Sequence, residues 1–236
     1  MDQARLKSFV QSIDSHVQHA QGTRKNFVWA FIGANGTGKT VTSLQLARAW
    51  RKYNPRRRII AFDPQGVLEA SLLDKGCGDL VIPRGEKNWA KILTREIAPH
   101  QYQFTNYLLF IDDYKMLCTD DRTNEGFLDL LALRRFINCD IILSTHNPSL
   151  ILERLSYYVT HYSIYFTSAA EGGFDKKTAN YANCEKACRI VRQYVMQEGM
   201  GTYPRFPYAL VTDRKKEIQL YNMDKKKVMD IIQRMS

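Results

Sequence analysis

The stretch that decides the fold runs from residue 26 to residue 40 and reads NFVWAFIGANGTGKT. Its first part, residues 26–32, is an apolar run rich in aromatic and β-branched residues, which predicts a buried strand. The run ends at Gly33, and apolar side chains from Gly38 to about Tyr53 recur at helical spacing. Residues 33–40 fit the pattern G-x-x-x-x-G-K-[ST] between that strand and that helix, so we predict a phosphate-binding loop (P-loop).

Each part of this motif has a chemical role in binding a nucleotide. Glycines let the backbone fold tightly enough for successive N–H groups to point at the phosphates, and the helix adds its positive N-terminal end. We expect Lys39 to contact the β- and γ-phosphates and the Thr40 hydroxyl to bind magnesium. ATP and Mg²⁺ are the predicted cofactors. The predicted nucleotide-binding residues are Gly33, Ala34, Asn35, Gly36, Thr37, Gly38, Lys39, Thr40 and Val41. A glycine-rich turn without a ligand is the alternative, but it does not require Gly, Lys and Thr together.

A second apolar run, Tyr107 to Ile111, ends in two acids, Asp112 and Asp113. We predict that Asp112 belongs to the magnesium shell and that Asp113 positions or deprotonates the attacking water. Two solvated acids at a strand end are the alternative. Next to a P-loop, such a pair is typical of hydrolases with an additional strand in the sheet, the RecA-like type, rather than of simple nucleotide kinases.

A third candidate segment, residues 144–149, reads STHNPS and follows another apolar run. In a parallel sheet the carboxyl ends of the strands line the ligand crevice, so Thr145, His146 or Asn147 could sense the γ-phosphate. We choose His146. The alternative is a local helix start, because Ser, Thr and Asn followed by Pro also make good caps.

Strands alternate with helices along the chain, which predicts an α/β fold with a mostly parallel central sheet and helices on both faces. The further predicted strands span residues 58–62, 107–111, 140–143 and 157–166, and a helix spans 125–137. The tail is expected to contain a helix over 182–195, a β-hairpin of 208–211 with 217–221, and a short final helix capped by Asp224. We predict a single P-loop ATPase domain over residues 1–236, with an N-terminal helix (1–22), a core (26–166) and a C-terminal part (167–236).

The composition is basic: 34 Lys and Arg stand against 24 Asp and Glu, a net charge of +10, which favours a polyanionic partner. The basic runs are residues 56–58, 176–177, 214–216 and 225–227. The five cysteines lack the spacing of a metal site, so we expect reduced thiols and a reducing cytosol. No stretch approaches the about 18 apolar residues of a membrane-spanning helix, and no export signal is expected at the N-terminus.

Residues 26–166 resemble the FtsK/HerA superfamily of DNA-pumping ATPases, which includes virus genome-packaging ATPases and the related Zot-like phage assembly proteins. The segments that carry the resemblance are the P-loop, residues 59–66 (IIAFDPQG), the strand ending in Asp112-Asp113, and residues 141–149 (IILSTHNPS). Two positions depart from the family pattern. His146 stands where Gln is usual, and Asp113 stands where Glu is common.

The resemblance implies a ring, hexameric or pentameric, in which an arginine of one subunit reaches the nucleotide of the next. The candidates for this arginine are Arg134 and Arg135, with Arg84 and Arg154 behind them. It also implies translocation of double-stranded DNA, in viral genome packaging into a capsid. A capsid portal or vertex is then a partner, and the host cytoplasm or the virion is the location.

Two other functional classes remain open. One is a Zot-like phage or plasmid assembly or secretion ATPase, which acts on protein or at a membrane. The other is an ATP-dependent switch that does not translocate. The sequence contains neither the Asn-Lys-x-Asp motif that reads guanine nor the Leu-Ser-Gly-Gly-Gln signature of ABC ATPases, which disfavours those classes.

Overall fold

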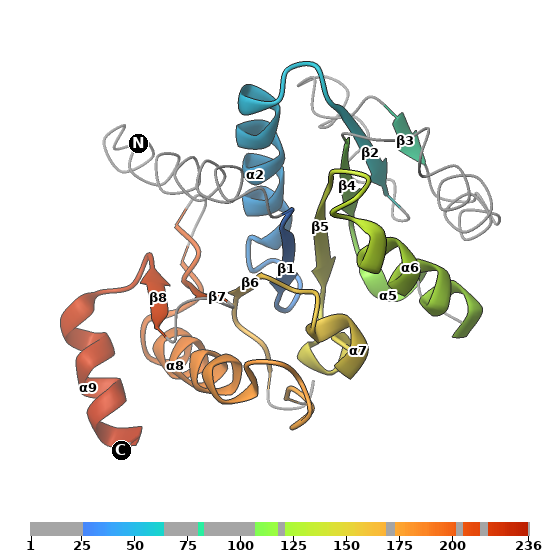
Figure 1. Ribbon diagram of the computed structural model, residues 1–236. Coiled ribbons are helices and arrows are strands. Elements are labelled where there is room, and N and C mark those ends of the chain that lie inside the picture. Colours follow the sequence, from blue (N-terminus) through green and yellow to red (C-terminus); the bar gives the residue numbers. More distant parts are fainter. Residues whose placement is uncertain are drawn as a thin grey trace. The chain divides into compact units, whose positions relative to one another are not determined.

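The structure is a computed structural model that describes residues 26–63, 80–82, 107–117, 121–168, 173–201, 205–212 and 217–235 (Figure 1). These residues fall into two compact units. Unit 1 takes its described residues from Met1–Val28 and Thr40–Ser144, and unit 2 from Trp29–Lys39 and Thr145–Ser236. The predicted N-terminal helix, Arg84 and the basic run 214–216 lie outside the described residues. The single-domain organisation stays a prediction.

Unit 1 contains a parallel set of strands in the order β3-β2-β4-β5. Their bounds are β2 Arg58–Phe62, β3 Leu80–Ile82, β4 Tyr107–Ile111 and β5 Cys139–Thr145. The register pairs Phe62 with Ile111 and Ile111 with Leu143. Because neighbouring parallel strands end together, the residues that follow these positions, Asp112 and Ser144 among them, lie at one edge of the strands.

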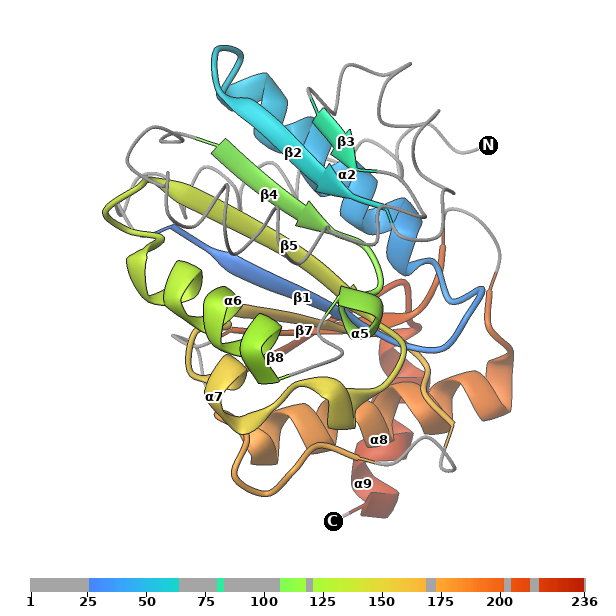
Figure 2. The ribbon, with the colours of Figure 1, turned by 90° about the vertical axis from the view of Figure 1, so that its right-hand side faces the viewer.

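Helices cover both faces of the unit 1 strands, with α2 (Lys39–Tyr53) on one face and α5 (Tyr114–Leu117) and α6 (Asp121–Leu133) on the other (Figures 1 and 2). Trp50 of α2 and Phe127 of α6 are fully buried. The predicted helix 125–137 was wrong at both ends, since α6 begins at residue 121 and ends at residue 133. Asn138 adopts a left-handed conformation (φ 53°), which turns the chain from the helix into β5.

Unit 2 contains the parallel pair β1 (Val28–Ile32) and β6 (His161–Ile164) and two antiparallel strands beyond β6. β7 (Tyr208–Thr212) pairs with β6, and β8 (Ile218–Tyr221) pairs with β7, so the predicted hairpin is confirmed. The strand predicted over 157–166 was too long. It begins at His161, because residues 153–158 form the short helix α7 (Glu153–Ser156) and a turn.

The C-terminal helices of unit 2 pack on its strands and on each other. α8 (Tyr181–Glu198) contacts β6 and β7, and α9 (Lys225–Met235) packs on α8 through a buried cluster of Ile190, Tyr194, Val228 and Ile231. The Asp224 carboxylate accepts the backbone N–H groups of Lys226 and Lys227, each at 3.0 Å. The predicted cap of the final helix is therefore confirmed.

The α/β class, with mostly parallel strands and helices among them, is as predicted. Among the residues described, no helix has both the length and the apolar character needed to cross a membrane.

Candidate nucleotide site

The P-loop leaves the end of β1 and is held by backbone hydrogen bonds within unit 2. The Gly33 N–H donates to the Thr145 carbonyl at 3.2 Å, and the Ala34 N–H donates to the Phe166 carbonyl at 2.8 Å. These bonds fix the start of the loop to Thr145, the last residue of β5, and to the segment that follows β6. The strand, loop and helix order that the sequence predicts is confirmed over residues 28–53.

The glycines of the motif have structural reasons. Gly36 (φ 75°) and Gly38 (φ 92°) adopt backbone conformations that L side chains rarely take. Gly33 is required by a close approach, because a Cβ there would lie 2.6 Å from the Tyr165 Cβ. The tight curvature of the loop therefore depends on these positions.

Lys39 is buried, and its ammonium group crosses the loop. Its Nζ donates to the Ala34 carbonyl at 2.8 Å and lies 3.3 Å from Nδ1 of His146. The Thr37 hydroxyl donates to the same carbonyl at 2.8 Å. The structure thus brings His146, chosen from the sequence as a γ-phosphate sensor, next to the P-loop lysine.

The acidic pair lies in unit 1 at the carboxyl end of β4, where both side chains are buried. Ser144, at the end of the neighbouring strand β5, connects them. Its hydroxyl donates to Oδ1 of Asp112 at 2.6 Å and accepts the backbone N–H of Asp113 at 3.0 Å. Asp113 has a positive φ of 47°, a strained conformation of the kind that clusters at functional sites.

Ser144 was missed as a site residue by the sequence reasoning. The signal that would have found it is the strand register. Ile111 is paired with Leu143, so the residues that follow them, Asp112 and Ser144, are neighbours. The sequence predicted both strands but not their register.

The residues predicted to bind magnesium fit that ion chemically. Mg²⁺ prefers hard oxygen ligands and keeps several waters, so one carboxylate and one hydroxyl suffice on the protein side. Asp112 supplies a carboxylate oriented by Ser144, and Thr40 supplies a hydroxyl in the first turn of α2. No group of three or more His, Cys, Asp or Glu side chains that could hold a metal occurs in the described ranges.

The candidate arginines differ in exposure. Arg134, which directly follows α6, is buried, and its guanidinium donates to the Leu131 carbonyl in the last turn of α6 at 2.7 Å. Arg135 and Arg154 are exposed. An arginine that reaches a neighbouring subunit must be accessible, so the structure favours Arg135 over Arg134.

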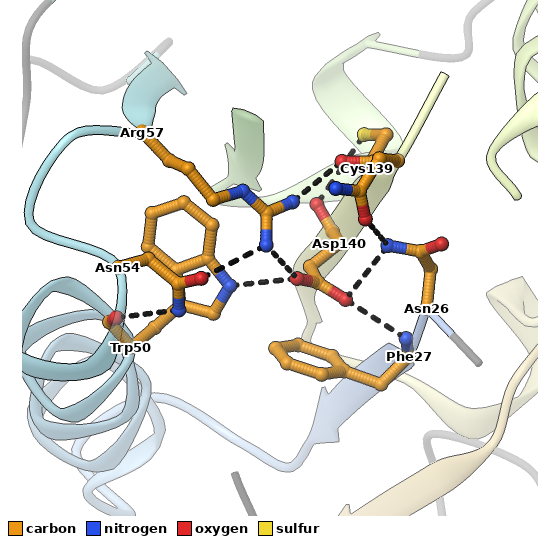
Figure 3. A network of polar contacts seen from close by, with 8 residues as sticks. Asn26, Phe27, Trp50, Asn54, Arg57, Cys139 and Asp140 are labelled. Carbon is orange, nitrogen blue, oxygen red and sulfur yellow. Dashed lines mark hydrogen bonds and ion pairs between the residues drawn. The ribbon is translucent and has the colours of Figure 1, made fainter. Parts of the chain in front are cut away.

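A buried polar network lies in unit 1 around Asp140, near the amino end of β5 (Figure 3). The Asp140 carboxylate accepts hydrogen bonds from the Trp50 Nε1–H at 2.7 Å and from the backbone N–H of Phe27 at 3.0 Å. It also forms an ion pair with the Arg57 guanidinium at 3.4 Å. The Arg57 guanidinium also stacks on the Trp50 ring, 4.7 Å from its centroid. Burial raises the pKa of Asp140, although Trp50 and Arg57 oppose this shift. Arg57 is thus a structural residue of the basic run 56–58, and its neighbours Arg56 and Arg58 are exposed.

The lysines of the basic runs 176–177 and 225–227 are all exposed, but two of them have protein partners. Lys227, in the first turn of α9, forms an ion pair with Glu198 of α8 and so helps to hold α9 on α8. This pairing offsets the unfavourable interaction of a cation with the positive N-terminal end of the helix dipole. Lys177 pairs loosely with Glu153 at 3.9 Å. Lys176 and Lys177 lie on a turn bounded by the buried Phe174 and Thr178.

Comparison with known proteins gives a likeness in structure only. No family model matches the sequence, and no curated protein matches it. The DNA-packaging ATPase B204 of Sulfolobus Turreted Icosahedral Virus has a TM-score of 0.55 at 12% identity, over 83% of this chain and 96% of that chain. The genome packaging NTPase B204 of Sulfolobus turreted icosahedral virus 2, in complex with ATP-gammaS, has a TM-score of 0.54 at 12% identity, over 83% of this chain and 96% of that chain. The cytoplasmic domain of the Type VII secretion ATPase EccC of Thermomonospora curvata gives 0.57 at 13% identity, over 90% of this chain and 28% of that chain. The chain therefore shares the α/β fold of these nucleotide-hydrolysing proteins, with a mostly parallel sheet, as the sequence predicts.

Proposed function

We propose that this chain hydrolyses ATP and uses the free energy to translocate double-stranded DNA, in the packaging of a viral genome into a capsid. The P-loop is the observation that carries the proposal. Its glycines, its buried Lys39 and the adjacent His146 form a cradle suited to a nucleoside triphosphate. In this proposal Thr40 and Asp112 hold Mg²⁺, which neutralises phosphate charge, and Asp113 orients or deprotonates the attacking water.

The DNA part of the proposal rests on two observations. The fold is similar to that of a DNA-packaging ATPase over 96% of that chain. The net charge of +10 suits a polyanionic track. Lys176, Lys177 and the lysines at the start of α9 are the proposed phosphate contacts, while Lys227 is partly committed to Glu198.

The test is the rate of ATP hydrolysis with and without double-stranded DNA. We expect turnover in the protein alone, a severalfold rise on adding duplex DNA, and loss of both in Lys39→Ala. Lys186→Ala removes an exposed lysine of α8 and serves as the matched control. Hydrolysis that DNA does not change would remove the translocation proposal while leaving the ATPase in place.

The second candidate is a secretion or assembly ATPase, favoured by the likeness to EccC over 90% of this chain. An unfolded or signal-bearing protein, rather than DNA, would then stimulate hydrolysis. An ATP-dependent switch would respond to neither and would show slow turnover. The same assay, run with DNA and with protein substrates, separates these functions.

A further inference from the structure

Phe206 lies directly against the P-loop within unit 2. A Cβ built on Gly38 would be 2.2 Å from Cδ2 of the Phe206 ring and 2.5 Å from its Cγ, so the ring packs on the bare backbone of Gly38. Gly38 immediately precedes Lys39, whose ammonium group spans the loop at 2.8 Å from the Ala34 carbonyl. Phe206 as a whole is only partly buried.

The C-terminal hairpin holds Phe206 in this position. The Phe206 carbonyl accepts Nδ2 of Asn222 at 2.9 Å, and Asn222 itself turns the chain after β8 with a φ of 59°. Phe206 also stands just before β7, which is hydrogen-bonded on both sides, to β6 and to β8. The backbone of Phe206 is therefore fixed by the sheet rather than carried on a free loop.

A stack of tyrosines supports the same arrangement from the other end of the P-loop. Tyr165, whose Cβ approaches Gly33, stacks on Tyr208 with ring centroids 5.1 Å apart. Tyr208 stacks in turn on Tyr221 of β8 at 4.8 Å. Gly33 and Gly38, the first and last glycines of the motif, thus each contact an aromatic residue that the hairpin positions.

The chemistry of a phenyl ring decides which part of a nucleotide it contacts. The ring offers no hydrogen bond to phosphate oxygens, and displacing water from charged phosphates without replacing those bonds is costly. A flat base or the apolar face of a ribose, in contrast, packs well on an aromatic ring. We propose that Phe206 forms an apolar wall of the nucleotide site and packs against the nucleoside part of ATP. This inference rests on the proposed binding of ATP by the P-loop.

The test compares the affinities of ATP and of inorganic tripolyphosphate, which carries the phosphates without the nucleoside. In Phe206→Ala we expect ATP affinity to fall about tenfold, the size of one lost base–aromatic contact. Tripolyphosphate affinity should stay within about twofold, and Phe206→Trp should retain ATP binding. Phe136→Ala removes a solvated ring elsewhere, with 81% exposure, and is the matched control.

Other results would overturn the inference. Unchanged ATP affinity in Phe206→Ala would show that the ring does not contact the nucleotide. Tighter binding of both ligands would show that the ring blocks the phosphates, and equal weakening of both would show that it only shapes the loop. If Phe206→Ala fails to fold, Phe206→Leu preserves the apolar packing and removes the flat face. The ratio of its ATP affinity to its tripolyphosphate affinity then tests the inference in the same way. Failure of the wild-type protein to bind either ligand would instead remove the proposed function itself, and this inference with it.

Discussion

At the scale of single residues, the hydroxyl of Ser144 contacts both members of the acidic pair. Its one hydroxyl serves both aspartates, as a donor to Asp112 at 2.6 Å and as an acceptor for the N–H of Asp113 at 3.0 Å. A buried polar group that loses its partner costs about 1–3 kcal/mol, so removal of this hydroxyl affects both residues at once.

We therefore predict that Ser144→Ala lowers the turnover of ATP about tenfold and raises the Mg²⁺ concentration required for half-maximal rate severalfold. The Mg²⁺ dependence is the informative measurement. A variant that only folds less well would contain less active protein, but the Mg²⁺ concentration required for half-maximal rate would not change. Ser144→Thr retains a hydroxyl and should restore most of the activity. An unchanged Mg²⁺ dependence in Ser144→Ala would contradict the assignment of Asp112 to the metal.

The sequence predicted the P-loop, the acidic pair and His146 because local patterns carry them. Glycine spacing, an apolar run before two acids, and a polar segment after a strand can each be read from a few consecutive residues. Ser144 and Phe206 could not be found in this way. Ser144 depends on the register of two strands and is separated from Asp112 by 32 positions in the sequence. Phe206 contacts a loop from a remote part of the chain.

At the scale of elements, buried strands were predicted better than the segments between them. The runs 58–62 and 107–111 coincide with β2 and β4, because a continuous apolar run bounded by polar residues marks a buried strand. β3 is only three residues long and was missed. α6 ends before residue 137, because the turn to β5 and its left-handed Asn138 overrode the apolar pattern.

The Asp140 network joins four parts of unit 1 (Figure 3). Asp140 of β5 contacts Trp50 of α2, Arg57 just before β2, and Phe27 just before β1. Burial raises the pKa of Asp140 above the ordinary value of 3.8. A carboxyl whose pKa is higher in the folded state stabilises the fold below its unfolded pKa and loses that contribution as the pH rises through the folded pKa.

The stability of the wild type relative to Asp140→Asn should therefore decrease as the pH rises from below about 4 through the raised pKa. Urea denaturation of both proteins across this range measures the difference in unfolding free energy. Asp230→Asn changes an exposed carboxyl of α9 and is the control for the general effect of one acid. A difference that grows with rising pH would show that the pairing with Arg57 and Trp50 outweighs burial.

At the scale of the whole molecule, the proposed ring requires that one subunit complete the site of the next. Arg135 is the accessible candidate, since Arg134 is held within its own chain. Mixing Asp113→Asn subunits with Arg135→Ala subunits should restore part of the ATPase activity that each lacks alone, because some interfaces then combine two intact elements.

The matched control for this mixture is Arg56→Ala, which removes another exposed arginine and should leave activity near that of the wild type. The mass of the active species, measured in the same solution, should correspond to a hexamer or a pentamer. A monomer with full ATPase activity would exclude an arginine supplied by a neighbouring subunit.

The claim that the whole chain is an ATPase is tested most directly by single-turnover hydrolysis of bound ATP in the wild type and in Asp113→Asn. The amide that this substitution introduces cannot act as a base, while the P-loop and Asp112 remain. We predict that the variant binds ATP with near wild-type affinity and converts it to ADP more slowly by about 100-fold or more, on the order of the contribution of a general base. Equal rates of conversion in the two proteins would contradict the account.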